Sequence, residues 1–258
     1  MLENYGIDVE DRQIALDMGL PFLFSMQNGT YCSGPMLQTA EWFNLYLQPK
    51  GFLMKETKFS REEVPAFLEH HFPVMLGISN LSGGKHAVVS MGKEKGCWKF
   101  VNNKTRTGAE PEIQYFSYEE LIRRLESFVM IAALQKITPV TVDLKPYFRN
   151  SVNVLSQLKQ DIIAFSAVEQ TPQALRTAQD ILFRAILLDG ITMLELLEST
   201  ELVNTLKYIQ KGYLCALREN RPLVLADRIP MNQFEQAIED YIALIVDCEM
   251  KRNPQTGK

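Results

Sequence analysis

Paired cysteine motifs, an export signal and a long apolar run are all missing from this sequence. The four cysteines (Cys32, Cys97, Cys215 and Cys248) form no CxxC pair, and no HxxxH spacing indicates zinc. We therefore expect reduced thiols, no metal and no cofactor. The first residues contain neither a basic region nor an apolar stretch, which predicts a cytoplasmic protein without a signal peptide. The longest apolar runs, such as residues 128–134, are far too short to cross a membrane, so no membrane partner is expected.

Long basic runs are missing as well. The formal net charge of the 258 residues is −4, which does not suggest a nucleic-acid-binding surface. A content of 46% hydrophobic and 22% charged residues is ordinary for a globular chain of one or two domains. The sequence does not fix the oligomeric state, and a homodimer stays open.

The two halves of the chain differ in pattern, and together they predict an α+β protein. Short helical patterns alternate with β-rich runs up to about residue 138, whereas the chain after about residue 145 is almost entirely helical in pattern. Two prolines and several β-branched residues disfavour helix in residues 138–146. We therefore expect an α+β domain over 1–140 and an α-helical domain over 145–258.

Three consecutive runs in the first half are typical of β-strands joined by short turns. They span residues 73–79, 86–91 and 97–102, and we expect them to be adjacent and antiparallel. A further buried strand is expected over 129–134. Helices are expected over 9–18, 35–47, 60–70 and 117–125, the last two opening on capping boxes at Ser60–Glu63 and Ser117–Glu120.

The second half predicts about four helices in an antiparallel bundle. Thr171 and Pro172 indicate a helix start, and Gly190 indicates a helix end. The expected helices span 152–168, 171–190, 193–217 and 232–250.

His86 opens an apolar β-run directly after a glycine-rich turn, and the next strand ends in Asn102 and Asn103. A cysteine-type hydrolase needs this arrangement, because an imidazole takes the thiol proton and a side-chain oxygen on the neighbouring strand fixes the tautomer of the ring. A purely structural alternative stays open, in which His86 is hydrogen-bonded to backbone at a strand end.

The order of these segments resembles that of the papain-like cysteine peptidase superfamily. The likeness is to the bacteriocin-processing type, and within it to the family of the N-terminal domain of butirosin biosynthesis protein H. It covers roughly residues 1–135 and depends on order and spacing: Tyr5-Gly6-Ile7, Gly29-Thr30, the 36–44 helix, residues 73–78, His86-Ala87-Val88-Val89 and Phe100-Val101-Asn102-Asn103.

This resemblance implies a papain-like domain followed by a helical region, and acyl transfer rather than proteolysis. It makes His86 the base and Asn103, or Asn102, its orienting partner, where the family usually has an aspartate. The family's nucleophilic cysteine belongs about ten residues before a segment like Tyr5-Gly6-Ile7, so the resemblance places it upstream of Met1.

Cys32 is the rival nucleophile. It lies just before the helix expected from Pro35, and a helix N-terminus lowers the pKa of a thiol. Gln27 stands about where the resemblance would place a glutamine of the oxyanion hole. The alternative is a small, half-buried structural thiol.

Two functions therefore stay open. The first is a thiol acyltransferase or amide hydrolase acting on a peptide or an acyl-carrier-type substrate. The second is a non-catalytic relative that binds a peptide, carrier protein or partner through a retained cleft.

Overall fold

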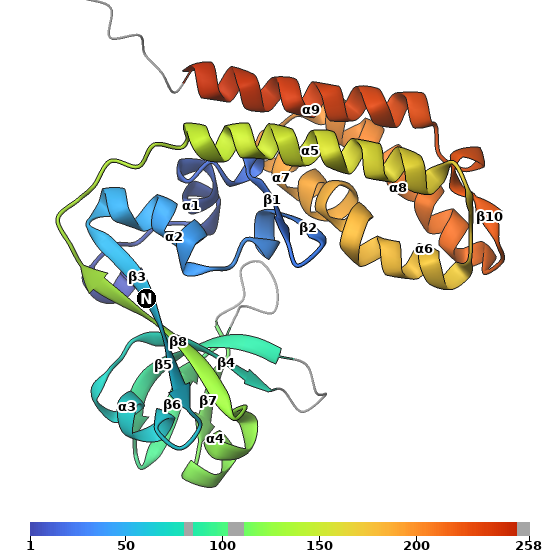
Figure 1. Ribbon diagram of the computed structural model, residues 1–258. Coiled ribbons are helices and arrows are strands. Elements are labelled where there is room, and N and C mark those ends of the chain that lie inside the picture. Colours follow the sequence, from blue (N-terminus) through green and yellow to red (C-terminus); the bar gives the residue numbers. More distant parts are fainter. Residues whose placement is uncertain (80–84, 103–110, 252–258) are drawn as a thin grey trace, which may run out of the picture. The chain divides into compact units, whose positions relative to one another are not determined.

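The computed structural model describes residues 1–79, 85–102 and 111–251 (Figure 1). The chain divides into two compact units. Residues 1–9 and 39–141 form the first, which we call the sheet unit, and residues 10–38 with those from 142 onward form the second, the helical unit. No helix within the described residues has the length and apolarity needed to cross a membrane.

A six-stranded antiparallel sheet is the centre of the sheet unit. Its spatial order is β3-β8-β4-β5-β6-β7, so the middle strands β4, β5 and β6 are sequential neighbours. The antiparallel pairing of β4 with β5 and of β5 with β6 confirms the expected adjacent strands. The strands span Phe52–Ser60 (β3), Val74–Ser79 (β4), Lys85–Glu94 (β5), Cys97–Val101 (β6), Ile113–Phe116 (β7) and Phe128–Lys136 (β8).

Two helices cover one face of this sheet and enclose its core (Figure 1). Alternate residues of the strands point to that face, as in β6, where Trp98 and Phe100 are buried. They pack against Val64 and Leu68 of α3 (Val64–His70) and Leu121 of α4 (Tyr118–Arg124). A third helix, α2 (Ala40–Leu47), packs on β3.

Of the two expected capping boxes, the one at Ser117 forms completely and the one at Ser60 forms only in part. At α4 the Ser117 hydroxyl accepts from the Glu120 amide at 3.3 Å, and the Glu120 carboxylate accepts from the Ser117 amide at 3.1 Å, which confirms the box. At α3 only the return bond forms: the Glu63 carboxylate accepts from the Ser60 amide at 2.8 Å. Ser60 pairs with Phe128 as the last residue of β3, so α3 begins at Val64 and the expectation of a helix from Ser60 is wrong.

Six α-helices and two consecutive π-helical stretches form most of the described part of the helical unit. The two longest, α5 (Lys145–Ser166) and α9 (Met231–Lys251), lie side by side (Figure 1). Their buried faces hold residues such as Leu155, Ile162 and Phe234. The other elements include α1 (Asp11–Asp17), α6 (Pro172–Ala178), the π-helical Gln179–Phe183 and Ala185–Gly190, α7 (Ile191–Leu196), α8 (Thr200–Glu219) and the strand pair β9 (Glu169–Gln170) and β10 (Leu223–Val224).

Residues 10–38 group with the helices and not with the sheet. Their hairpin, β1 (Phe24–Gln27) and β2 (Thr30–Ser33), is tied to the helices by hydrogen bonds from both strands. The Phe24 amide donates to Ser151 Oγ (2.8 Å), Tyr31 Oη donates to Asp161 Oδ2 (2.5 Å), and Ser33 Oγ donates to the Ala185 carbonyl (2.6 Å). The sequence-based division placed this segment in the first domain, whereas the expected boundary in 138–146 contains the break at Thr141–Val142.

Gly190 does not end a helix, so that expectation is wrong. The chain continues from the π-helical Ala185–Gly190 into α7 and turns only at Leu197. A Cβ at Gly190 would lie 2.8 Å from the Ala185 carbonyl oxygen and 3.6 Å from the Tyr241 ring. The glycine therefore permits close packing inside the helical unit.

Two phenylalanines of the sheet provide a matched test of this core. Phe100 is fully buried on the covered face, whereas Phe128 is 59% exposed. We expect Phe100→Ala to lower the free energy of unfolding by about 3–5 kcal/mol, because it leaves a cavity. Phe128→Ala should cost less than about 1 kcal/mol, since it loses only exposed contacts such as that with Lys58.

The measurement is urea unfolding followed by tryptophan fluorescence. Both tryptophans, Trp42 and Trp98, belong to the sheet unit, so the signal reports this unit. Equal losses for the two variants would contradict the assignment of the covered face.

Candidate functional site

The end of the sheet at β5 and β6 brings two predicted site residues together. His86 lies on β5 directly opposite Ile78 of β4, and Asn102 follows the last residue of β6. Because strand residues two apart share a face, His86 lies on the same face as buried Val88, and Asn102 on the same face as buried Phe100. The pair is half-buried and borders the core of the sheet unit.

Asn102 Oδ1 and His86 Nε2 form a hydrogen bond. An amide oxygen only accepts, so in this bond the hydrogen lies on Nε2. A neutral His86 ring held in this way carries its lone pair on Nδ1. Among the interactions between described residues, none involves Nδ1.

Glu112 fixes the orientation of the Asn102 amide. The Asn102 backbone amide donates to the Glu112 carbonyl at 2.8 Å, and Asn102 Nδ2 donates to Glu112 Oε2 at 3.1 Å. An ionised carboxylate only accepts, so it must face the amide nitrogen and leaves the amide oxygen to His86. The second carboxylate oxygen accepts from Gln114 Nε2 at 2.9 Å.

These contacts form a chain from carboxylate to amide to imidazole. Such a chain holds an imidazole in one tautomer and one orientation, with the opposite ring nitrogen available to take a proton. An imidazole oriented in this way can act as a general base.

Glu112 is a site residue that the sequence analysis missed. It stands ten residues after Asn102 and directly before β7, a strand that the sequence analysis did not predict. The signal was the alternation of Glu112, Gln114 and Phe116, which places all three on one side of a strand. Asn103, the other candidate partner of His86, lies outside the described residues.

Cys32 and Gln27 lie on the two strands of the hairpin in the helical unit. Gln27 pairs with Thr30, and Cys32 pairs with Ser25. His86 and Asn102 belong to the sheet unit, so the candidate residues fall into two pairs on different units.

Burial raises the pKa of the Cys32 thiol above its usual range, although a backbone hydrogen bond from Gln27 and the charge of Arg184 act in the opposite direction. The side chain is only 3% exposed, and its thiol donates to the Thr30 carbonyl at 3.5 Å. An activated cysteine needs exposure and a lowered pKa, and Cys32 has neither.

The helix expected from Pro35 does not begin there. Gly34–Met36 form a single 3₁₀ turn, and α2 begins at Ala40 after an extended Thr39. The Gln38 side chain donates to the Pro35 carbonyl and closes this turn. The expectation that a helix N-terminus lowers the pKa of the Cys32 thiol is therefore wrong, because no α-helix starts beside this residue.

Metal chemistry finds no support in the described part of the chain. No three His, Cys, Asp or Glu side chains gather there in a way that could hold an ion.

No protein-family model matches the chain, and no curated protein matches it at a significant level. The papain-like resemblance therefore stays a prediction based on the order of segments.

Alkylation of the cysteines provides a test of the Cys32 assignment. Iodoacetamide reacts with thiolates, and a raised pKa leaves less thiolate at neutral pH. At pH 7.5 we expect Cys32 to be modified at least about tenfold more slowly than exposed Cys215, as measured by peptide mass spectrometry. Faster modification of Cys32 than of Cys215 would overturn this view, and Cys215 serves as the control within the same sample.

The hydrogen-bond chain provides a second test. We expect the His86 Nε2 proton to give a resolved NMR signal, because its bond to Asn102 slows exchange with water. Asn102→Ala should abolish the signal and Glu112→Ala should weaken it. Glu112→Gln should retain it, since a glutamine oxygen still accepts from Asn102 Nδ2. Full retention of the signal in Asn102→Ala would contradict the assigned geometry.

Proposed function

We propose that the sheet unit is a relative of the papain-like thiol acyltransferases and amide hydrolases, with His86 as the base and Asn102 as its positioning partner. The observation that carries the proposal is the hydrogen bond between His86 Nε2 and Asn102 Oδ1, which is held in place by Glu112. It supports a role in which His86 Nδ1 accepts a proton.

The reaction follows from this assignment. His86 Nδ1 takes the proton of a thiol, and the thiolate attacks the carbonyl carbon of an amide or thioester. The tetrahedral adduct expels an amine or a thiol, which leaves with the proton held by the imidazolium, and an acyl thioester is formed. We propose a peptide or an acyl-carrier-type substrate as the acyl donor.

The source of the thiol is the open point of this proposal. Cys32 does not suit the role, because it is buried and its pKa is raised. A thiol carried by a substrate satisfies the same chemistry, since the imidazole needs only a proton donor within hydrogen-bond distance of Nδ1.

The same observation on Cys32 favours a second candidate function. An oriented His–Asn pair combined with a buried Cys32 suits a non-catalytic module, which would bind a peptide, carrier protein or partner beside His86. The two functions differ in whether acyl transfer is accelerated.

Acyl transfer to a thiol supplied in solution distinguishes them. We expect the wild-type chain to accelerate transfer of an acetyl group from an aryl thioester to N-acetylcysteamine. His86→Ala should lower this rate by about 10²-fold, the contribution typical of a general base.

His70→Ala is the matched control, because His70 is an exposed histidine at the end of α3. We expect no change in rate for this variant. Added imidazole should restore part of the activity of His86→Ala. Equal rates for wild type and His86→Ala would rule out the catalytic proposal and leave the binding module.

A further inference from the structure

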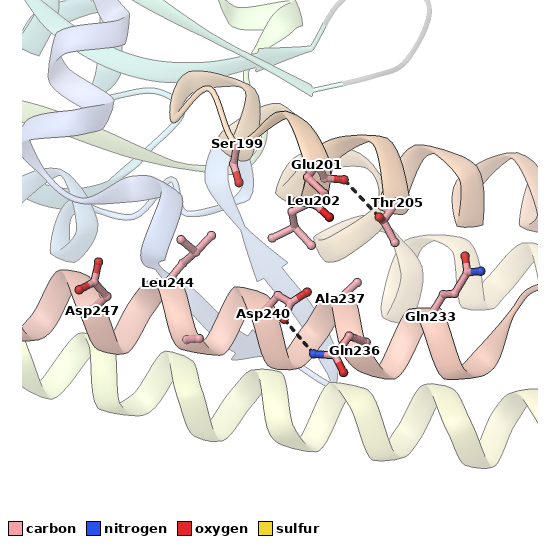
Figure 2. Close-up of a pocket in the computed structure, with 11 residues that line it drawn as sticks. Ser199, Glu201, Leu202, Thr205, Gln233, Gln236, Ala237, Asp240, Leu244 and Asp247 are labelled. Carbon is pink, nitrogen blue, oxygen red and sulfur yellow. Dashed lines mark hydrogen bonds between the residues drawn. The ribbon is translucent and has the colours of Figure 1, made fainter.

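A groove of about 590 Å³ lies between α8 and α9 within the helical unit (Figure 2). Ser199 and the first turns of α8 form one wall, and α9 from Gln233 to Asp247 forms the other. The α9 wall spans fourteen residue steps, or about 21 Å at 1.5 Å per residue. The α9 wall therefore has the length of about four helical turns, whereas the facing wall extends only from Ser199 to Thr205.

The bottom of the groove is apolar. Leu202 of α8 and Ala237 of α9 are buried, and Leu244 is half-buried beside them. Ala237 and Ala243 are small, so they let another backbone approach closely. This combination of small and branched apolar residues suits an inserted helix face.

Carboxylates stand on both walls. Glu201 belongs to α8, whereas Asp240 and Asp247 belong to α9, and no lysine or arginine is among the residues that line the groove (Figure 2). The Asp240 carboxylate accepts from Gln236 of its own helix at 2.9 Å. Asp247 pairs with Lys251 on its own helix, at 2.5 Å, and not across the groove.

The other side of α9 is arranged differently. Where α9 faces α5, Glu239 pairs with Lys159, and Glu249 pairs with Arg149 at 3.1 Å. Carboxylates against the neighbouring helix are thus neutralised by it. At the groove Asp247 has a cationic partner on its own helix, whereas Glu201 and Asp240 form no ion pair with another described residue. Like charges on two walls oppose each other, and a cationic occupant relieves this repulsion.

A single metal ion does not fit this pattern. The groove carboxylates are distributed along the helices, and no three acidic, histidine or cysteine side chains of the described residues converge on one point. An elongated cation with an apolar side is the chemistry that matches both the floor and the walls.

We propose that this groove docks a cationic amphipathic helix of a partner protein, about four turns long. Its leucine-sized side chains would lie on Leu202, Ala237 and Leu244, and its lysines or arginines would face Glu201, Asp240 and Asp247. The inference does not depend on the acyl-transfer proposal, and it argues against an acidic carrier protein at this surface, because like charges repel.

The test uses the full chain and a fluorescent fourteen-residue amphipathic peptide of Lys, Leu and Ala. We expect saturable binding by fluorescence anisotropy, and no binding of the same peptide with Glu in place of Lys. The double variant Asp240→Asn with Asp247→Asn should weaken binding at least tenfold, and raising the salt concentration should weaken it further.

Two further variants separate a shaped groove from a diffuse acidic surface. Ala243→Trp fills the groove without changing its charge, and it should weaken binding at least tenfold. Glu235→Gln removes a charge from exposed α9 outside the groove and should change binding less than twofold. Circular dichroism confirms that each variant is folded.

Several outcomes would overturn the proposal. Binding that is unchanged by Ala243→Trp, or reduced as much by Glu235→Gln as by the double variant, would show only diffuse charge attraction. Equal binding of the Lys and Glu peptides would show that the groove carboxylates do not select a cationic helix. Displacement of the peptide by micromolar spermine, with no effect of Ala243→Trp, would identify a polyamine-binding surface instead.

Discussion

Asn102 and Glu112 are joined twice, once through their backbones and once through their side chains. The orientation and tautomer of the His86 ring depend on these two hydrogen bonds. The carboxylate accepts and cannot donate, so it orients the amide, and the amide in turn orients the imidazole. Glu112 lies just before β7, and its position depends on the pairing of that strand with β6. The sheet register therefore determines which ring nitrogen is available for chemistry.

The elements that could be predicted from sequence are those whose signal is local. The alternation in β4, β5 and β6 and the short turns between them predicted an antiparallel set of strands, and the structure has it. The capping box at Ser117 depends on residues three apart and was also predictable. His86 and Asn102 were identified in the same way, since each marks the end of an apolar strand. The papain-like resemblance itself stays a prediction.

The remaining features depend on residues that are distant in sequence. Glu112 matters because β7 returns beside β6, and nothing within a few residues of Asn102 indicates this. Cys32 was expected beside a helix start, but the start moved to Ala40, and the hairpin that holds Cys32 is fixed by Ser151 and the other α5 contacts. Tertiary packing overrides local signals in each of these cases.

The assignment of residues 10–38 to the helical unit has a consequence for the chain during synthesis. The sheet unit is complete once residue 141 has left the ribosome, but the β1–β2 hairpin must wait for α5 and the later helices. Until then Leu23, Phe24 and Tyr31, all fully buried in the final structure, have no partner surface. Apolar side chains that stay exposed during synthesis favour aggregation and chaperone capture, so this early segment is vulnerable until the later helices emerge.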